Sequence, residues 1–308
     1  MFEIFNEEKK DEVEGETEVS YPSSQAQPSY SSPLTNVFVV SVGGSILVKG
    51  KPDKDAIAAV AACLNDLIRM GFKLVLVVGG GRVARDYVEA AKGLGANNFE
   101  LDELGIRITR ANAFLLLSSI DNAYPEVLTD IKLADDVLAK GKTPVFGGLM
   151  PGFTTDAVGA LLAEFLNATF VNISNVDGIY TADPAAHPSA RMYHEMGYGK
   201  LLEILVSNSM KPGQNLILDL PAATILKRSG IPAFFLGDDM ENVKSAIQGG
   251  SFHGTVVKHG SQEVLDGEPE EKPRRKSSRK KKVVKRKPSR VLVEEDDDEE
   301  IDPNKIRF

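Results

Sequence analysis

The sequence predicts an α/β protein with a largely parallel central sheet, and two observations support this fold class. Short runs rich in β-branched residues alternate along the chain with amphipathic or alanine-rich helical stretches, which is the order of strand–helix–strand units. The 308 residues are 42% hydrophobic and 26% charged, as in globular proteins of one or two domains. This composition excludes a collagen or a coiled coil, and no apolar run reaches the ~18–20 residues that cross a bilayer.

Six strands are expected where short aliphatic runs end at turn or helix signals. They are Asn36–Val42, Lys73–Val78, Thr143–Phe146, Thr169–Ile173, Ala233–Leu236 and Thr255–Val257. Glycine marks the ends of two intervening helices, because a residue in the left-handed conformation commonly terminates a helix. Gly71 follows the expected helix Asp55–Met70, and Gly230 follows Asn215–Ser229.

The formal charge of −8 is unevenly distributed and divides the chain into three parts. Residues 1–33 carry eight acidic and two basic side chains with few aliphatic ones, so we expect a disordered tail. Residues 34–260 are expected to form a single α/β domain. Residues 261–308 are expected to be a second disordered tail, with twelve Lys or Arg in residues 272–290 and an acidic run at 294–300.

The basic block of the second tail has two interpretations. Its side chains could neutralise nucleic-acid phosphates, but no aromatic residue is interleaved for base stacking. The adjoining acidic run can compensate the basic charge, which favours a solvated tail.

One cysteine and four scattered histidines indicate neither a disulfide nor a metal site. The acidic N-terminus lacks a secretory signal, so we expect a cytoplasmic protein with no membrane partner.

Glycine turns follow three of the expected strands. These turns are Gly43-Gly44-Ser45, Gly79-Gly80-Gly81 and Gly147-Gly148, and each precedes a helical pattern. Glycine lets the backbone approach a ligand closely, and the following helix start presents free N–H groups to an anion. A single such turn is equally well explained by steric needs, whereas three at one sheet edge favour a polyphosphate ligand. The P-loop and GxGxxG patterns are absent.

Polar residues beside these turns have both functional and structural explanations. Arg85 lies one helical turn after Gly81 and could reach a bound anion, or it could pair with Glu89 on the helix surface. Thr154-Thr155-Asp156 could bind phosphate or cap a helix, and Asp156 could orient Mg²⁺ or complement the helix dipole. Asp102-Glu103-Leu104-Gly105 opens the next expected helical stretch. The Asp102 carboxylate could bind ribose hydroxyls or be an ordinary acidic residue at a helix start.

A further segment with turn signals follows the fourth strand. Residues 174–184 contain Asp177-Gly178 and Asp183-Pro184, and turn chemistry accounts for the first pair. Tyr180 and Asp183 could in addition form a purine pocket.

Taken in order, these motifs resemble the amino acid kinase fold, and within it the uridylate kinases of archaeal type. The resemblance rests on Val39–Ser45, Gly79–Arg85, Asp102 with Gly105 and Asn112, Phe153–Ala157, Asn175–Pro184, Asp219–Ala223 and Gly254-Thr255. It covers residues 36–258 and neither tail. It implies a three-layer α/β/α sandwich, assembled as a homohexamer, that transfers the γ-phosphate of MgATP to UMP and yields UDP and ADP in pyrimidine nucleotide biosynthesis.

The resemblance also implies roles for individual residues. The ATP phosphates would contact Gly43, Gly44, Ser45, Gly81 and Arg85, and the adenosine would contact Ser174, Asn175, Tyr180 and Asp183. UMP would contact Gly80, Asp102, Gly148, Leu149, Met150, Pro151, Gly152, Phe153, Thr154 and Thr155, with Asp102 at its ribose and Thr155 at its phosphate. Arg85 and Asp156 would be the catalytic residues, and no protein metal ligand is assigned. These groups would align the reactants and neutralise charge during phosphoryl transfer.

Two positions depart from the pattern of other family members. Ser41 stands where bacterial uridylate kinases have a lysine, and archaeal-type members resemble this chain in lacking it. The missing charge would come from Mg²⁺, Arg85 or one of Lys49, Lys51 and Lys211, which the sequence does not rank. Asp219 stands where acetylglutamate kinases have a second lysine, which favours a nucleotide acceptor.

Two alternatives therefore remain at the sequence level. The same fold could phosphorylate another small acceptor, as isopentenyl phosphate and acetylglutamate kinases do. The domain could also be an anion-binding relative that has lost catalysis, with Ser41 as the mark of that loss. The presence of Arg85, Thr155 and Asp156 argues against the second alternative.

Overall fold

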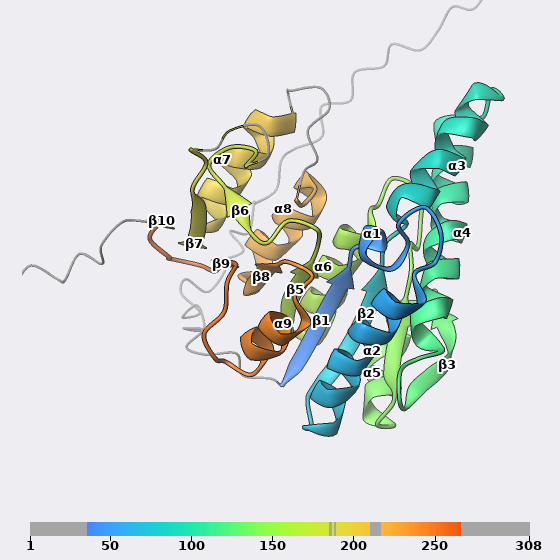
Figure 1. Ribbon diagram of the computed structural model, residues 1–308, viewed down its shortest axis with the longest axis horizontal. Coiled ribbons are helices and arrows are strands. Elements are labelled where there is room, and N and C mark those ends of the chain that lie inside the picture. The colour runs from blue at the N-terminus through green and yellow to red at the C-terminus, as the bar shows by residue number, and fades with distance from the viewer. Residues whose placement is uncertain (1–35, 185–186, 188, 210–216, 266–308) are drawn as a thin grey trace, which may run out of the picture. The chain divides into compact units, whose positions relative to one another are not determined.

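The computed structural model describes residues 36–184, 187, 189–209 and 217–265, and in this part of the chain a mixed sheet lies between two layers of helices (Figure 1). Its strand order is β10-β7-β9-β8-β5-β1-β2-β4-β3, with β6 paired to β7. The expected tail at 1–33 and residues 266–308 of the second tail lie outside the described residues.

The six expected strands are confirmed. They are β1 (Val37–Val42), β2 (Lys73–Val78), β4 (Thr143–Phe146), β5 (Thr169–Ile173), β8 (Ala233–Leu236) and β9 (Thr255–Val257). The central strands β8, β5, β1, β2 and β4 pair in parallel, whereas β9 runs antiparallel to β8. Both faces of these strands are covered, which explains why they are nearly continuous aliphatic runs.

Four further strands lie toward the sheet edges and were not expected. They are β3 (Ala123–Leu128), β6 (Ile179–Tyr180), β7 (Met192–Met196) and β10 (Val264–Leu265). Strand β3 contains Pro125 and exposes Glu126, as an edge strand can, and β7 carries His194 at its centre. Two residues are too few for a recognisable pattern in β6 or β10.

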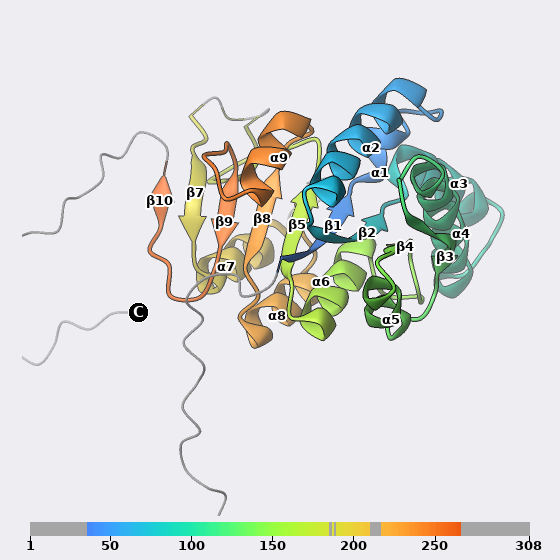
Figure 2. The same cartoon turned by 90° about the horizontal axis from the view of Figure 1, so that it is seen from below.

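Helices cover the sheet on two sides (Figure 2). The helices are α1 (Gly44–Leu47), α2 (Lys54–Arg69), α3 (Gly81–Gly93), α4 (Asn98–Leu117), α5 (Leu133–Ala139), α6 (Thr155–Leu166), α7 (Tyr198–Ser209), α8 (Leu220–Ser229) and α9 (Met240–Ile247). Side chains of α2, α4 and α9 share a core with Val40 and Leu76. Side chains of α5, α6, α7 and α8 pack with Val39 and Val77 on the opposite face. This alternation follows from the pleat and completes the expected three-layer sandwich.

The glycine signals at the helix ends are confirmed. Gly71 has φ of 95° after α2, and Gly230 has φ of 63° as the C-cap of α8. The start of α8 differs from the expectation, because the helix begins at Leu220 and not at Asn215. Asp219 is its N-cap and accepts a hydrogen bond from the Ala222 N–H at 2.7 Å.

Among the described residues, no helix combines the length and the apolar character that spanning a membrane requires.

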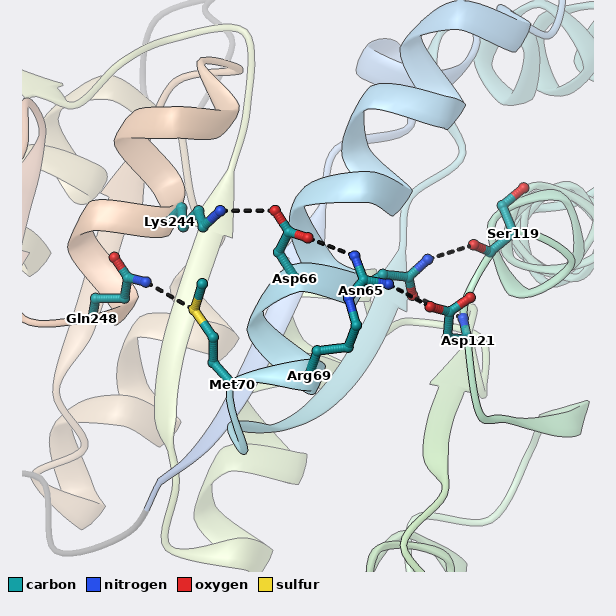
Figure 3. Close-up of polar contacts among 8 residues, drawn as sticks. All are labelled: Asn65, Asp66, Arg69, Met70, Ser119, Asp121, Lys244 and Gln248. Atoms are coloured by element: carbon teal, nitrogen blue, oxygen red, sulfur yellow. Dashed lines mark hydrogen bonds and ion pairs between the residues drawn. The ribbon is translucent and has the colours of Figure 1, made fainter.

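Helix α2 is tied to neighbouring segments on both sides by polar contacts (Figure 3). The buried Asn65 amide donates to the Ser119 carbonyl at 3.0 Å and accepts from the Asp121 N–H at 2.8 Å. On the other side, the Asp66 carboxylate lies 2.7 Å from Lys244 of α9. These contacts hold α2 between α9 and the turn that follows α4.

We expect Asn65→Ala to lower the free energy of unfolding by about 1–3 kcal/mol, because the change removes both hydrogen bonds of the buried Asn65 amide, to the part-buried Ser119 carbonyl and Asp121 N–H. Urea denaturation followed by circular dichroism measures this loss. The matched control is Gln248→Ala in the same region, since the exposed Gln248 amide contacts only the Met70 sulfur in Figure 3. The control should change stability by less than ~0.5 kcal/mol. An equally small change in Asn65→Ala would show that the hydrogen bonds of Asn65 do not stabilise the fold.

Candidate active site

A cleft of about 1080 Å³ opens at the carboxyl ends of the central parallel strands. This is the edge where ligands bind in open α/β sheets. Most of the residues expected at a site line it: Gly43, Gly44, Ser45, Gly80, Gly81, Arg85, Asp102, Gly148, Gly152, Phe153, Thr154, Thr155, Asp156, Ser174, Asn175, Tyr180 and Asp183. The cleft thus brings together motifs from five separate segments of the chain.

The first two glycine turns touch each other across the cleft floor. A Cβ on Gly44 would lie 2.3 Å from both the Gly79 carbonyl oxygen and the Gly81 nitrogen, so only glycine fits at this position. Gly81 has φ of 64°, a conformation that also favours glycine. The N-termini of α1 and α3 therefore begin side by side at one end of the cleft. Backbone N–H groups at such helix starts suit phosphate oxygens.

Helix α4 holds the second and third glycine turns from behind. The buried Asn112 amide donates to the carbonyls of Gly79 and Gly80 at 3.0 and 3.1 Å. The Thr109 hydroxyl accepts from the Gly148 N–H at 2.7 Å, and Arg110 donates to the Gly148 carbonyl at 3.0 Å. The Gly79 N–H donates to the Val42 carbonyl at 2.9 Å. Because Asn112 engages only carbonyls, the N–H groups of Gly80 and Gly81 are left for other partners.

The polar residues at the start of α6 take different positions. Thr154 is the N-cap, with its hydroxyl oxygen 3.1 Å from the Ala157 nitrogen, and it also donates to Asp219. Capping thus accounts for Thr154. Thr155 is the first residue of the helix and lines the cleft near Gly79.

Asp156 lies at the centre of a small polar cluster. One of its carboxylate oxygens accepts hydrogen bonds from the Ser41 hydroxyl at 2.8 Å and from the Asn172 amide at 3.0 Å. Removal from water raises the pKa of Asp156 to about 6; the hydrogen bond from Ser41 opposes the rise and the charge of Asp219 adds to it. The oxygens of this cluster are the hard ligands that suit Mg²⁺.

Arg85 lines the same cleft from the second turn of α3. Its side chain is exposed, and no ion pair with Glu89 occurs among the described side chains. A neighbouring cation, Arg82, instead faces Asp86 at 3.9 Å with its side chain 74% exposed. Arg85 is therefore available to a bound anion.

Asp102 is not at the start of its helix, contrary to the expectation. Helix α4 begins at Asn98, where Asn97 and Glu100 form a reciprocal capping box. Asp102 lies in the second turn, and its carboxylate accepts from the Gly152 N–H at 2.8 Å. This contact brings Asp102 to the loop between β4 and α6.

The segment after β5 forms the opposite wall of the cleft. The Ser174 hydroxyl bonds the backbone of Val176 in a local turn. The Asp177 carboxylate accepts from the Tyr180 hydroxyl at 2.7 Å. Apolar side chains of Ile204, Leu205 and Ile217 complete this wall, so the cleft has a glycine-rich polar end and a partly apolar end.

Several expected site residues lie elsewhere. Leu149 packs partly buried against the core, Met150 is 53% exposed, and neither they nor Pro151 line the cleft. Lys49 and Lys51 are exposed in the loop after α1 and do not line it either. Lys211 lies outside the described residues. Of the bases considered for the missing charge that the structure describes, Arg85 is thus the one that lines the cleft.

The structure adds site residues that were not assigned from the sequence. Asn172 sits near the end of β5 and would have been a candidate as a side-chain amide in a buried, mostly apolar strand. Thr109 and Arg110 act on the glycine turns through α4, and no local pattern distinguishes them from surface residues.

Comparisons with known proteins agree with this geometry. Residues 36–237 match the model of the amino acid kinase family. A uridylate kinase from Pyrococcus abyssi is 42% identical over 224 residues, which cover 72% of this chain and 99% of the relative.

Two solved structures are also similar. The crystal structure of uridylate kinase from Archaeoglobus fulgidus is 39% identical, with a TM-score of 0.65 over 71% of this chain and 99% of that chain. The UMP kinase from Bacillus anthracis, at 21% identity and a TM-score of 0.64, covers 75% of this chain and 98% of its own, and shares the fold. This chain belongs to the amino acid kinase family, within its uridylate kinases of archaeal type.

Proposed function

We propose that this chain transfers the γ-phosphate of MgATP to UMP, giving UDP and ADP. The observation that carries the proposal is that the glycine turns, Arg85 and two differently built segments line one and the same cleft. One end is formed by residues 174–184 and the other by Asp102 with the loop that contains Gly152 and Phe153. A single cleft of this kind can hold two phosphorylated ligands end to end. The relatives are named uridylate kinases, which supplies UMP as the acceptor, and MgATP is the donor that the family resemblance implies.

The donor would occupy the end built by the segment after β5. Its triphosphate would meet the N–H groups of Gly44, Ser45 and Gly81 and pass close to Gly43, whose own N–H donates to the Ile173 carbonyl. Its nucleoside would meet Ser174, Asn175, Tyr180 and Asp183. The apolar side chains of Leu205 and Ile217 at this end suit a purine ring. The side chain of Tyr180 offers a flat face for the same ring.

The acceptor would occupy the end closed by Asp102. An exposed carboxylate there suits the two hydroxyls of a ribose, and the hydroxyl of Thr155 at the start of α6 suits a monophosphate. Phe153 is 38% exposed and lines the cleft, as a side chain that stacks on a base would. We keep Gly80, Gly148, Leu149, Met150 and Pro151 as predicted backbone or loop contacts to UMP.

Phosphoryl transfer needs alignment and charge neutralisation more than covalent chemistry. Arg85 would lie between donor and acceptor and bind oxygens of the transferred group, while the glycine-turn amides hold the donor in line. Mg²⁺ bound to the donor phosphates would neutralise part of their charge. Asp156 would orient that ion or its waters, with Ser41 and Asn172 fixing its carboxylate. Homohexameric assembly and a role in pyrimidine nucleotide biosynthesis remain predictions from the family resemblance. A cytoplasmic location remains a prediction from the acidic N-terminus.

The acceptor is tested with purified protein in a coupled assay of ADP release, with MgATP and one of UMP, CMP, AMP or acetylglutamate. We expect UMP to be turned over fastest, with UDP as the product by chromatography. Faster turnover of CMP or of a non-nucleotide would contradict the proposed acceptor. Binding of both nucleotides without any transfer would instead support the anion-binding alternative.

We expect Arg85→Ala to lower turnover with UMP by at least ~100-fold, the scale of losing one donor to the transition state. Steady-state kinetics at saturating substrates measure this loss. Arg82→Ala is the matched control, because Arg82 lies on the same helix and does not line the cleft. It should retain activity within about twofold. Near wild-type turnover in Arg85→Ala would remove this residue from the mechanism.

Asp156→Asn should stabilise the fold at pH 8 by about 1–3 kcal/mol while turnover falls by at least ~100-fold. Folding raises the pKa of Asp156 from 3.8 to about 6. Above pH 6 the folded wild type is therefore destabilised, because it holds an ionised carboxylate away from water. As the pH falls from 6 toward 4, the folded wild type binds a proton, and the difference in stability between the two proteins should shrink to about a third of its pH 8 value at pH 4.5. Urea denaturation of both proteins at pH 8 and 4.5 measures the difference in their stability and its sign. A less stable Asn variant at pH 8 would refute it.

A further inference from the structure

A short C-terminal segment holds the donor side of the cleft at three consecutive residues. We call His253, Gly254 and Thr255 the 253–255 clasp. The Thr255 hydroxyl accepts from the Ile179 N–H at 2.8 Å and donates to the Tyr193 carbonyl at 2.5 Å. A Cβ on Gly254 would lie 3.3 Å from the Asp177 carbonyl oxygen and 2.6 Å from that of Phe235, so the backbone passes very close here. These two residues fix the course of the chain at Asp177–Ile179.

His253, the remaining residue of the clasp, contacts a side chain, whereas Gly254 and Thr255 contact backbone atoms. The Nε2 atom of His253 lies 2.9 Å from Oδ2 of Asp177. Because an ionised carboxylate only accepts hydrogen bonds, the imidazole N–H donates. Burial would raise the pKa of Asp177, but the hydrogen bonds from Tyr180 and His253 outweigh it, and the pKa lies below its usual value. The contact therefore favours the ionised carboxylate.

The Asp177 carboxylate bridges two partners with its two oxygens. Oδ2 faces His253, and Oδ1 accepts from the Tyr180 hydroxyl at 2.7 Å. Both Asp177 and Tyr180 line the cleft, whereas His253 does not. The side chain of Asp177 is 46% exposed, so without His253 its carboxylate could rotate toward water. The orientation of the Tyr180 ring thus depends on a residue outside the cleft.

His253 is itself held from behind by α9. The Asn242 amide donates to the His253 carbonyl at 2.7 Å and accepts from the His253 N–H at 2.7 Å. This pair of bonds fixes the backbone of His253 independently of its imidazole. Shortening the His253 side chain should therefore leave the loop in place. Since that side chain is 57% exposed, the change creates no buried cavity.

We propose that His253 is a positioning residue for the donor nucleotide, acting through Asp177 to hold the Tyr180 ring against the nucleoside. This inference rests on the proposed function, because it takes the residue 174–184 end of the cleft as the donor site. Its effect belongs to nucleotide binding and not to the chemical step. Loss of His253 should weaken MgATP binding while turnover at saturating MgATP stays close to that of the wild type.

The test measures MgATP binding to the full chain by calorimetry without acceptor, beside steady-state kinetics with UMP. We expect His253→Ala to raise Kd and KM for MgATP by about 3- to 10-fold, the effect of losing one exposed charged hydrogen bond. KM for UMP should change by less than about twofold. His253→Gln keeps a donor at similar reach and should restore most of the affinity. The matched control is His259→Ala, an exposed histidine that does not line the cleft, and it should bind MgATP like the wild type.

A double-mutant cycle distinguishes an effect of His253 through Asp177 and Tyr180 from a general effect on the fold. Tyr180→Phe removes the hydroxyl that contacts Asp177, so adding His253→Ala to it should raise Kd for MgATP by less than about twofold. His253→Leu, which lacks a donor but fills similar space, is measured in parallel and should behave like His253→Ala. If the Ala variant does not fold, the Leu variant carries the same comparison.

The outcomes separate this inference from the proposed function. Unchanged MgATP affinity in His253→Ala and His253→Leu would overturn the inference, and so would fully additive effects with Tyr180→Phe. A loss in kcat without a change in Kd would overturn it as well. If the wild type binds MgATP but forms no UDP, the proposed function fails while calorimetry still decides the role of His253.

Discussion

The contact between the first two glycine turns is the constraint on which the rest of the site depends. Parallel pairing of β1 with β2 brings Gly44 against the backbone of Gly79 and Gly81, at a distance that no side chain permits. Two helix N-termini then start next to each other, and their positive ends face the same volume. Asn112 binds the carbonyls of the second turn from behind, which keeps its amides pointing away from α4. An anion site follows from backbone geometry before any charged side chain is considered.

The charge balance at the cleft floor differs from that of a site with a lysine at position 41. Here Ser41 donates a neutral hydrogen bond to Asp156, which fixes the carboxylate without neutralising it. The pKa of Asp156 is raised because burial disfavours the ionised carboxylate more than the hydrogen bond from Ser41 stabilises it. A carboxylate in this state gains most from a ligand that brings a cation with it. Donor phosphates bound with Mg²⁺ are such a ligand under the function that we propose.

The sequence predicted the centre of the sheet and the glycine turns because both depend on local patterns. β1 and β2 are continuous aliphatic runs, and each ends at a glycine that the next helix follows. The edge strand β3, with Pro125 and an exposed Glu126, has no such pattern. Asp102 was expected at a helix start, but the capping box at Asn97 and Glu100 begins α4 one turn earlier. The roles of Thr109 and Asn172 depend on which segments meet in space, and sequence spacing alone does not give that.

The two ends of the cleft differ in how they are held, and this difference bears on how each responds to a ligand. At the start of α6, Thr154 contacts Asp219 at the start of α8, and near the ends of the same helices Glu164 contacts Arg228. The parallel helices α6 and α8 are thus joined at both ends, so the part of the cleft at the start of α6 rests on a pair of connected helices. The opposite wall depends on Asp177, whose partners Tyr180 and His253 come from the short strand β6 and from the 253–255 clasp. Partly exposed hydrogen bonds of this kind open more easily than packed helices, so the end near Tyr180 is where ligand binding should order the protein most.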